Sequence, residues 1–310
     1  MLFTAEATQQ ACMPKAAPIR SRRHFAIIYQ WPWRIVIVAT LALCAAITKA
    51  APRYGDLPLF DGHIHYNQDV WDVIAPDNAI KRLRAAGIER AFVSSTPTEG
   101  TKRLFAQDPA RIIPLLRPYR SSADRRTWFE DPELVARLRQ HLNIIPYRGI
   151  GEFHLFGANA STPVMAEVID LAAEHGLFLL VHADGDAIIR IVEQAPGLTV
   201  IWAHTGFDVP VARLGELLAR YPKLLIELSF RDDIAPVGKL SNDWRQLFVA
   251  QPERFLVGTD TYIASRWAEL GESAHEARSW LAQLPPGVAD RIAFQNAAEL
   301  VKVIDKQSAN

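Results

Sequence analysis

From residue 57 onward, short apolar runs alternate with amphipathic stretches of helical periodicity, and this alternation constrains the fold more than any other feature. Strands that alternate with helices form parallel sheets built from βαβ units. Eight such runs in about 260 residues match the size of one closed (β/α)₈ barrel of the α/β class, the TIM barrel. We therefore predict a single-domain TIM barrel over 51–310, with strands near 57–61, 90–95, 111–117, 147–152, 177–182, 198–203, 223–229 and 255–260.

The predicted helices occupy segments between these strands, and several end in residues that terminate helices. His175-Gly176 and Tyr221-Pro222 are two such endings. The last predicted helix would close the bottom of the barrel. We expect helices at 78–86, 132–141, 163–175, 187–194, 209–221, 243–250, 264–284 and 289–304.

Possible metal ligands stand at the ends of five of the apolar runs. The C-terminal ends of the strands in a parallel barrel converge on one face, where enzymes of this fold hold their active sites. Polar residues that recur at successive strand ends therefore predict a shared site. The residues are His63, His65, Glu152, His182, His204 and Asp260.

The spacing of His63 and His65 supports this prediction, because alternate residues of a strand point to the same side. Both imidazoles would then face the barrel axis. Neutral imidazole and carboxylate suit Zn²⁺ and similar divalent ions. We expect one or two divalent ions per chain, with Zn²⁺ the first choice and the identity left open.

Residues 1–50 differ in composition from the remainder and resemble an export segment. They hold six Lys or Arg and one acidic residue, with an apolar core at 35–47 followed by Thr48 and Ala50. This arrangement is typical of a signal peptide cleaved after Ala50, and a retained N-terminal anchor is the alternative. The Arg22-Arg23 pair also fits the twin-arginine pathway. We expect a periplasmic or secreted protein.

The charge and cysteine content of the mature chain exclude some functions. Without residues 1–50, 28 basic and 33 acidic residues remain, a net charge of −5. This balance disfavours a nucleic-acid-binding surface. Both cysteines, Cys12 and Cys44, lie in the export segment, so no mature thiol could act as nucleophile or ligand. The expected partner is a small-molecule substrate, with membrane contact only through an uncleaved N-terminal segment.

The motifs as a whole resemble the amidohydrolase superfamily of metal-dependent barrels. The superfamily pattern has His-x-His after strand 1, histidines after strands 5 and 6, and an aspartate after strand 8. The sequences around 59–65, 201–206 and 294–298 are similar to the amidohydrolase-2 branch. This resemblance implies a metal-dependent hydrolase and assigns roles to individual positions. A first ion would be bound by His63, His65 and Asp260.

The resemblance leaves the number of ions open. His182 and His204 would bind a second ion, or His182 would join the first ion while His204 contacts water or substrate. Glu152 stands where many members carry a carboxylated lysine, which is similar to TatD-type nucleases, whose glutamate bridges two ions. The alternative is that Glu152 faces the substrate or supports other ligands.

The expected chemistry needs no nucleophilic side chain. A bound divalent ion lowers the pKa of water from about 15.7 towards 7. The resemblance implies that Asp260 takes the proton and returns it to the leaving group, which is general acid–base catalysis. His204 is the second catalytic candidate. The chain accordingly has no Gly-x-Ser-x-Gly motif.

Three more residues are candidates for substrate binding. His154 follows Glu152 by two positions and would share its face of the strand. Arg117, at the end of strand 3, and Arg231, after strand 7, could hold an anionic group. The alternatives are a strand-end cap for His154 and salt bridges at the barrel rim for both arginines.

We expect hydrolysis of a small-molecule amide, lactone or ester. The alternatives are a metal-dependent decarboxylase of aromatic or unsaturated acids, a TatD-like nuclease, and a non-catalytic metal-binding barrel. The nuclease is disfavoured by the acidic balance and the expected export. Substrate identity and oligomeric state stay open.

Overall fold

The computed structural model describes residue 55 and residues 57–308. The predicted export segment at 1–50 and its cleavage site lie outside the described residues. Within the described residues, no helix combines the length and hydropathy needed to cross a membrane.

Eight parallel strands form one sheet in which each strand pairs with the next along the chain. The ring closes between its first and last strands, where the Gly62 amide donates to the Val257 carbonyl over 2.7 Å. The His65 amide donates to the Thr261 carbonyl over 2.9 Å. The single-domain TIM barrel is therefore confirmed. Its strands are β1 (Leu59–Ile64), β2 (Ile88–Val93), β3 (Ile112–Leu116), β4 (Gly149–Leu155), β5 (Phe178–Ala183), β6 (Val200–Ala203), β7 (Leu224–Glu227) and β8 (Phe255–Leu256).

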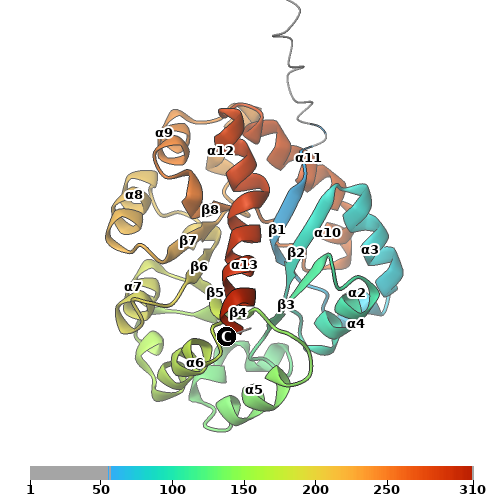
Figure 1. The fold of residues 1–310 in the computed structure, drawn as a ribbon, viewed down its shortest axis with the longest axis vertical. Helices are drawn as coiled ribbons and strands as arrows, with labels where there is room; N and C mark the ends of the chain where they lie inside the picture. Colours follow the sequence, from blue (N-terminus) through green and yellow to red (C-terminus); the bar gives the residue numbers. More distant parts are fainter. Residues whose placement is uncertain (1–54, 56, 309–310) are drawn as a thin grey trace, which may run out of the picture. The chain divides into compact units, whose positions relative to one another are not determined.

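Large apolar side chains fill the barrel interior, as in other packed TIM barrels. Phe60, Phe92 and Phe178 pack in series there with tilted rings, whose centroids are 4.7 and 4.9 Å apart. The same cluster includes Val301 and Ile304 of the last helix, α13 (Asn296–Ser308). Figure 1 shows α13 crossing the ring of strands. The predicted closure of the barrel bottom by the C-terminal helix is confirmed.

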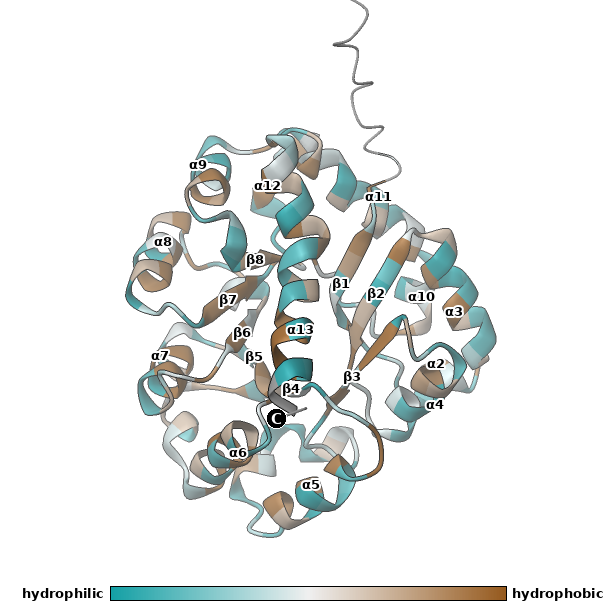
Figure 2. Ribbon diagram, viewed as in Figure 1, coloured by the Kyte–Doolittle hydropathy of each residue, from teal (hydrophilic) through white to brown (hydrophobic). Residues whose placement is uncertain are grey.

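The remaining helices pack around the outside of the strands. Figure 2 shows largely apolar strands surrounded by helices that combine apolar and polar residues. Their apolar stripes face the sheet and leave the polar stripes outside. The principal helices are α3 (Pro76–Ala85), α4 (Glu99–Gln107), α5 (Leu134–Leu142), α6 (Pro163–Glu174), α7 (Gly185–Gln194), α8 (Val211–Arg220), α9 (Asn242–Ala250) and α11 (Leu270–Leu281).

Four segments differ from the sequence-based prediction. Helix α4 and the short α2 (Gln68–Trp71) were not predicted, because neither segment carries a long apolar stripe. The predicted helix at 264–284 divides into α10 (Ala264–Ala268) and α11. The predicted helix at 289–304 comprises the end of α12 (Pro286–Asp290), a π-helical turn at Arg291–Gln295 and most of α13.

Candidate metal centre and active site

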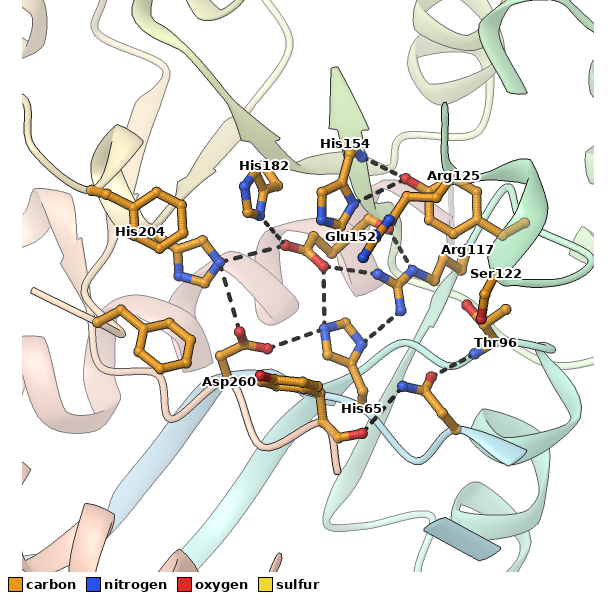
Figure 3. A pocket seen from close by; sticks show the side chains of 15 residues that line it. His65, Thr96, Arg117, Ser122, Arg125, Glu152, His154, His182, His204 and Asp260 are labelled. Atoms are coloured by element: carbon orange, nitrogen blue, oxygen red, sulfur yellow. Dashed lines mark hydrogen bonds and ion pairs between the residues drawn. The ribbon is translucent and has the colours of Figure 1, made fainter. Parts of the chain in front are cut away.

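The six predicted ligand residues converge at the C-terminal ends of the strands. His63 lies on β1, with His65 directly after it, and Glu152 and His182 lie on β4 and β5. His204 follows β6, and Asp260 follows β8. Figure 3 shows side chains of this group directed towards one another: His65, Glu152, His182, His204 and Asp260.

Two histidines and two carboxylates form the tightest part of the cluster. The Nε2 atoms of His63 and His65 are 3.0 Å apart. Oδ1 of Asp260 lies 3.5 Å from His63 Nε2 and 3.3 Å from His65 Nε2. Oε2 of Glu152 lies 3.6 and 3.2 Å from the same two nitrogens. Four possible ligand atoms thus surround one point.

The second oxygen of Glu152 faces the other two histidines. Its Oε1 lies 3.0 Å from His182 Nδ1 and 3.5 Å from His204 Nε2. His204 Nε2 is also 3.8 Å from Asp260 Oδ2. The Glu152 carboxylate therefore lies between the His63–His65 pair and the His182–His204 pair.

In His63 and His65, the ring nitrogen that faces away from the cluster is Nδ1. The hydrogen bond that Nδ1 makes determines which nitrogen of each ring carries the proton. His65 Nδ1 is 2.7 Å from the Ser94 carbonyl oxygen, which can only accept, so Nδ1 is protonated and Nε2 has a free lone pair. His63 Nδ1 faces the Glu227 carboxylate at 3.0 Å, which fixes the same tautomer. The Arg117 guanidinium lies farther from His65 Nδ1, at 3.3 Å, so the shorter carbonyl contact decides.

Buried lone pairs and carboxylates of this kind require a positive charge between them. Burial would raise the pKa of Glu152, but its close contacts with His63, His182 and His204 hold that pKa well below 4.5. Asp260 behaves alike: burial opposes ionisation, yet His63 and His65 lower its pKa to about 2. The donor set therefore fits a divalent ion bound by imidazole and carboxylate.

Glu227 and Ser229, which the sequence analysis did not select, support two of these histidines. Glu227 is fully buried, and Oε2 accepts from His63 Nδ1 and from the Ser229 hydroxyl at 2.9 Å. The Ser229 hydroxyl in turn lies 2.8 Å from His204 Nδ1 and accepts a hydrogen bond from it. One carboxylate therefore orients His63 directly and His204 through Ser229. The polar ending of the apolar run Leu224-Leu-Ile-Glu227 was the signal that could have identified it.

Several residues in and beside the cluster have backbone angles in the left-handed region, which non-glycine residues seldom adopt, among them His204, Phe207, Phe230 and Asp260. Their φ angles are 56° for His204, 63° for Phe207, 58° for Phe230 and 41° for Asp260. Such conformations cost free energy and persist where surrounding contacts hold them. Here they occur just beyond β6, β7 and β8, where the chain turns away from the barrel.

A pocket of about 510 Å³ opens above the cluster, within the size range of small-molecule sites. Arg117 and His154, two of the predicted substrate-binding residues, line it. Arg231 does not; its guanidinium pairs with Asp233 at 2.8 Å and hydrogen-bonds Thr205. Among the other polar lining residues, Thr96 follows β2 and Arg125 follows β3.

His154 is uncharged at neutral pH. Burial lowers its pKa to about 3, against the opposing charge of Glu152. The Tyr119 hydroxyl accepts from the His154 backbone amide over 2.6 Å and lies 3.1 Å from His154 Nδ1. Because that hydroxyl already accepts from the amide, its own proton is available to Nδ1, and the ring proton is then on Nε2.

This chain is similar to known proteins in sequence and in fold. Residues 70–303 match the model of the amidohydrolase family. A TatD homologue from Escherichia coli superposes with a TM-score of 0.54 at 16% identity, covering 79% of this chain and 97% of the other. No curated protein matches this chain.

Two further solved structures are similar in fold. A protein from Agrobacterium tumefaciens, solved without ligand, has a TM-score of 0.51 at 16% identity and covers 79% of this chain and 95% of its own. A protein from Lactobacillus casei described as a metal-dependent hydrolase has a TM-score of 0.51 at 12% identity, with 84% and 98% covered. At these identities the structures support the fold alone.

Proposed function

This chain belongs to the amidohydrolase family, a family of metal-dependent hydrolases, and we propose that it hydrolyses an amide, lactone or ester bond of a small molecule. One observation carries the proposal: free imidazole lone pairs and ionised carboxylates converge on the floor of a pocket of about 510 Å³. A pocket of this volume accommodates a compound of drug-like size.

We propose that His63, His65, Asp260 and Glu152 hold a divalent ion, with Zn²⁺ as the best match to this mixed donor set. Glu152 Oε1, His182 and His204 would hold a second ion, and Glu152 would bridge the two. When bound, such an ion would supply Lewis acidity, which would lower the pKa of water towards 7 and polarise a scissile carbonyl.

Asp260 is the proposed general base and acid. Its pKa of about 2 keeps it ionised at neutral pH, so it can accept a proton from the attacking water and pass it to the leaving group. His204 presents Nε2 without a proton, since Nδ1 donates to Ser229. It can therefore bind an ion or accept a proton at Nε2, according to the number of ions present.

The test compares Asp260→Asn with the wild-type enzyme on a panel of amides, lactones and esters after metal loading. We expect kcat to fall on the order of 10²–10⁴-fold, the usual scale for loss of a general acid–base. Elemental analysis should show that at least part of the metal remains, held by His63 and His65. Asp170→Asn, at an exposed aspartate of α6, should leave both quantities unchanged.

Two results would overturn the proposal. Full activity of Asp260→Asn at normal metal content would exclude Asp260 from the reaction. Release of CO₂ from aromatic or unsaturated acids, without hydrolysis of any member of the panel, would replace hydrolysis by decarboxylation.

A further inference from the structure

We propose that the pocket selects substrates that carry a carboxylate, which Arg125 binds, and an apolar group, which Phe207 and Phe230 bind. This inference rests on the proposed function, because it places a hydrolysable bond between the two groups. All three residues line the pocket above the candidate metal centre.

The two arginines that the sequence analysis selected for an anion are already engaged. Arg117 donates from Nε to the Glu152 carbonyl and from Nη2 to Glu152 Oε2, both over 2.9 Å. Arg231 forms two 2.8 Å contacts with Asp233. An anionic substrate would have to compete with these internal carboxylates, so neither guanidinium is a free anion site.

Arg125 is different. It lies on a short 3₁₀ helix, η2 (Ser122–Arg126), between β3 and β4, and its side chain lines the pocket. Among the described residues it has no hydrogen-bond or ion-pair partner. Its charge nevertheless reaches the pocket, because it adds to the burial that lowers the pKa of His154 and opposes the burial that raises the pKa of Tyr119. Figure 3 shows the Arg125 side chain reaching in beside His154.

Two uncharged groups of the pocket lining have no hydrogen-bond partner within the described residues. The Thr96 hydroxyl, which follows β2, is buried and makes no hydrogen bond within the described residues. An unsatisfied buried hydroxyl costs free energy unless a ligand completes it. The second group is the N–H at His154 Nε2, which carries the ring proton because Nδ1 faces the Tyr119 hydroxyl. Within the described residues, this N–H has no hydrogen-bond acceptor. Together with Arg125, the pocket lining therefore holds three donors that a ligand could engage.

The opposite part of the pocket is aromatic. Phe207 and Phe230 follow β6 and β7 and are 45% and 39% exposed, which is unusual for phenylalanine. Phe207 stacks on His204 with ring centroids 4.7 Å apart. Because strand order runs consecutively around the ring, loops after β6 and β7 lie across the barrel from those after β2 and β3. The candidate metal centre lies between the two parts.

A substrate that satisfies both parts spans the metal centre. Its carboxylate pairs with the Arg125 guanidinium, a charge-assisted contact that Thr96 and His154 can supplement. Its apolar group covers Phe207 and Phe230, and the scissile amide, lactone or ester bond lies between these groups. A single guanidinium with neutral donors matches a monoanionic carboxylate better than a phosphate dianion.

Binding of two probes by metal-loaded protein tests the inference. The probes are 3-phenylpropanoate and its neutral isostere 3-phenylpropanamide, measured by isothermal titration calorimetry. Wild type should bind the carboxylate more tightly than the amide. Arg125→Gln should weaken carboxylate binding on the order of 10-fold or more, because a hydrogen bond to a charged group is lost. Amide binding should change less than about twofold.

Arg126→Gln is the matched control, since Arg126 is exposed on the same helix and does not line the pocket. It should leave both affinities unchanged. Thr96→Val, which removes the unsatisfied hydroxyl at constant volume, should weaken carboxylate binding without lowering the melting temperature. Circular dichroism confirms that each variant is folded.

Three outcomes would overturn the inference: no preference for the carboxylate in wild type, no loss in Arg125→Gln, or an equal loss in Arg126→Gln. Preferential binding of phenyl phosphate through Arg125 would replace the carboxylate by a phosphate. Failure of the proposed function looks different, because the hydrolysis panel would then be negative while the carboxylate preference and its dependence on Arg125 persist.

Discussion

Nδ1 of His63 lies 3.0 Å from Oε2 of Glu227, and neither side chain is exposed to solvent. The contact joins the end of β7 to the centre of the candidate metal site. It fixes the proton of His63 on Nδ1 and directs the Nε2 lone pair to the cluster. Glu227 is therefore a positioning residue, and several measurable properties should depend on it.

Glu227→Gln should weaken divalent-metal binding on the order of 10–100-fold, the usual range when the hydrogen-bond partner of a metal-ligating histidine is lost. Competition with a chromophoric chelator measures the affinity. Gly258→Ala should act in the same direction, because a Cβ there would lie 2.0 Å from Glu227 Oε1. Glu216→Gln, at an exposed glutamate of α8, is the control. Unchanged affinity in Glu227→Gln would rule out the positioning role.

Glu152→Gln should lower the bound metal from about two ions per chain to one, because an amide is a weak substitute for a shared carboxylate. The expectation follows from its two oxygens, which face His65 and His182 at 3.2 and 3.0 Å. Elemental analysis of wild type and variant gives the count. One ion in wild type, unchanged in the variant, would indicate a mononuclear site in which His204 contacts water or substrate.

Removal of the metal should abolish activity and leave the barrel folded. The apolar side chains in the barrel and beneath its helices supply most of the burial, and the cluster lies at one end of this core. Far-UV circular dichroism after chelation should therefore change little. Global unfolding on chelation would show instead that the ions are structural.

Asp108→Asn should destabilise the protein at neutral pH but not at low pH. Burial would raise the pKa of Asp108, yet hydrogen bonds from Arg84 and from the Arg111 amide outweigh it and hold the pKa below 3.8. The folded state therefore favours the ionised carboxylate. The ionised Asp108 carboxylate contributes fully to the free energy of unfolding when the pH is above its pKa in the unfolded chain. This contribution disappears as the pH falls through the lower pKa that Asp108 has in the folded protein.

Urea denaturation of wild type and Asp108→Asn between pH 7 and pH 2 measures this difference. The two stabilities should converge at the acidic end, whereas Asp170→Asn should match wild type throughout. A difference that stays constant across this range would show that the effect of Asp108 is independent of its charge.

The barrel and the six clustered residues could be predicted from sequence because each depends on local pattern. A buried strand is apolar along its length, so His182 and Asp260 stand out where their strands end. The parallel order of the strands then brings those ends together. The convergence of His63, His65, Glu152, His182, His204 and Asp260 followed from these two regularities alone.

The partners of each polar side chain depended on tertiary structure. Arg117, Arg125 and Arg231 all lie beyond strand ends and look alike in sequence, yet two pair with carboxylates and one does not. Glu227 is separated from His63 by 164 residues and meets it only because the barrel closes. The sequence pattern determined which side chains lie at the C-terminal ends of the strands. Only the tertiary structure decided how their charges and protons are paired, because hydrogen bonds and ion pairs act over a few ångströms of space, whatever the separation along the chain.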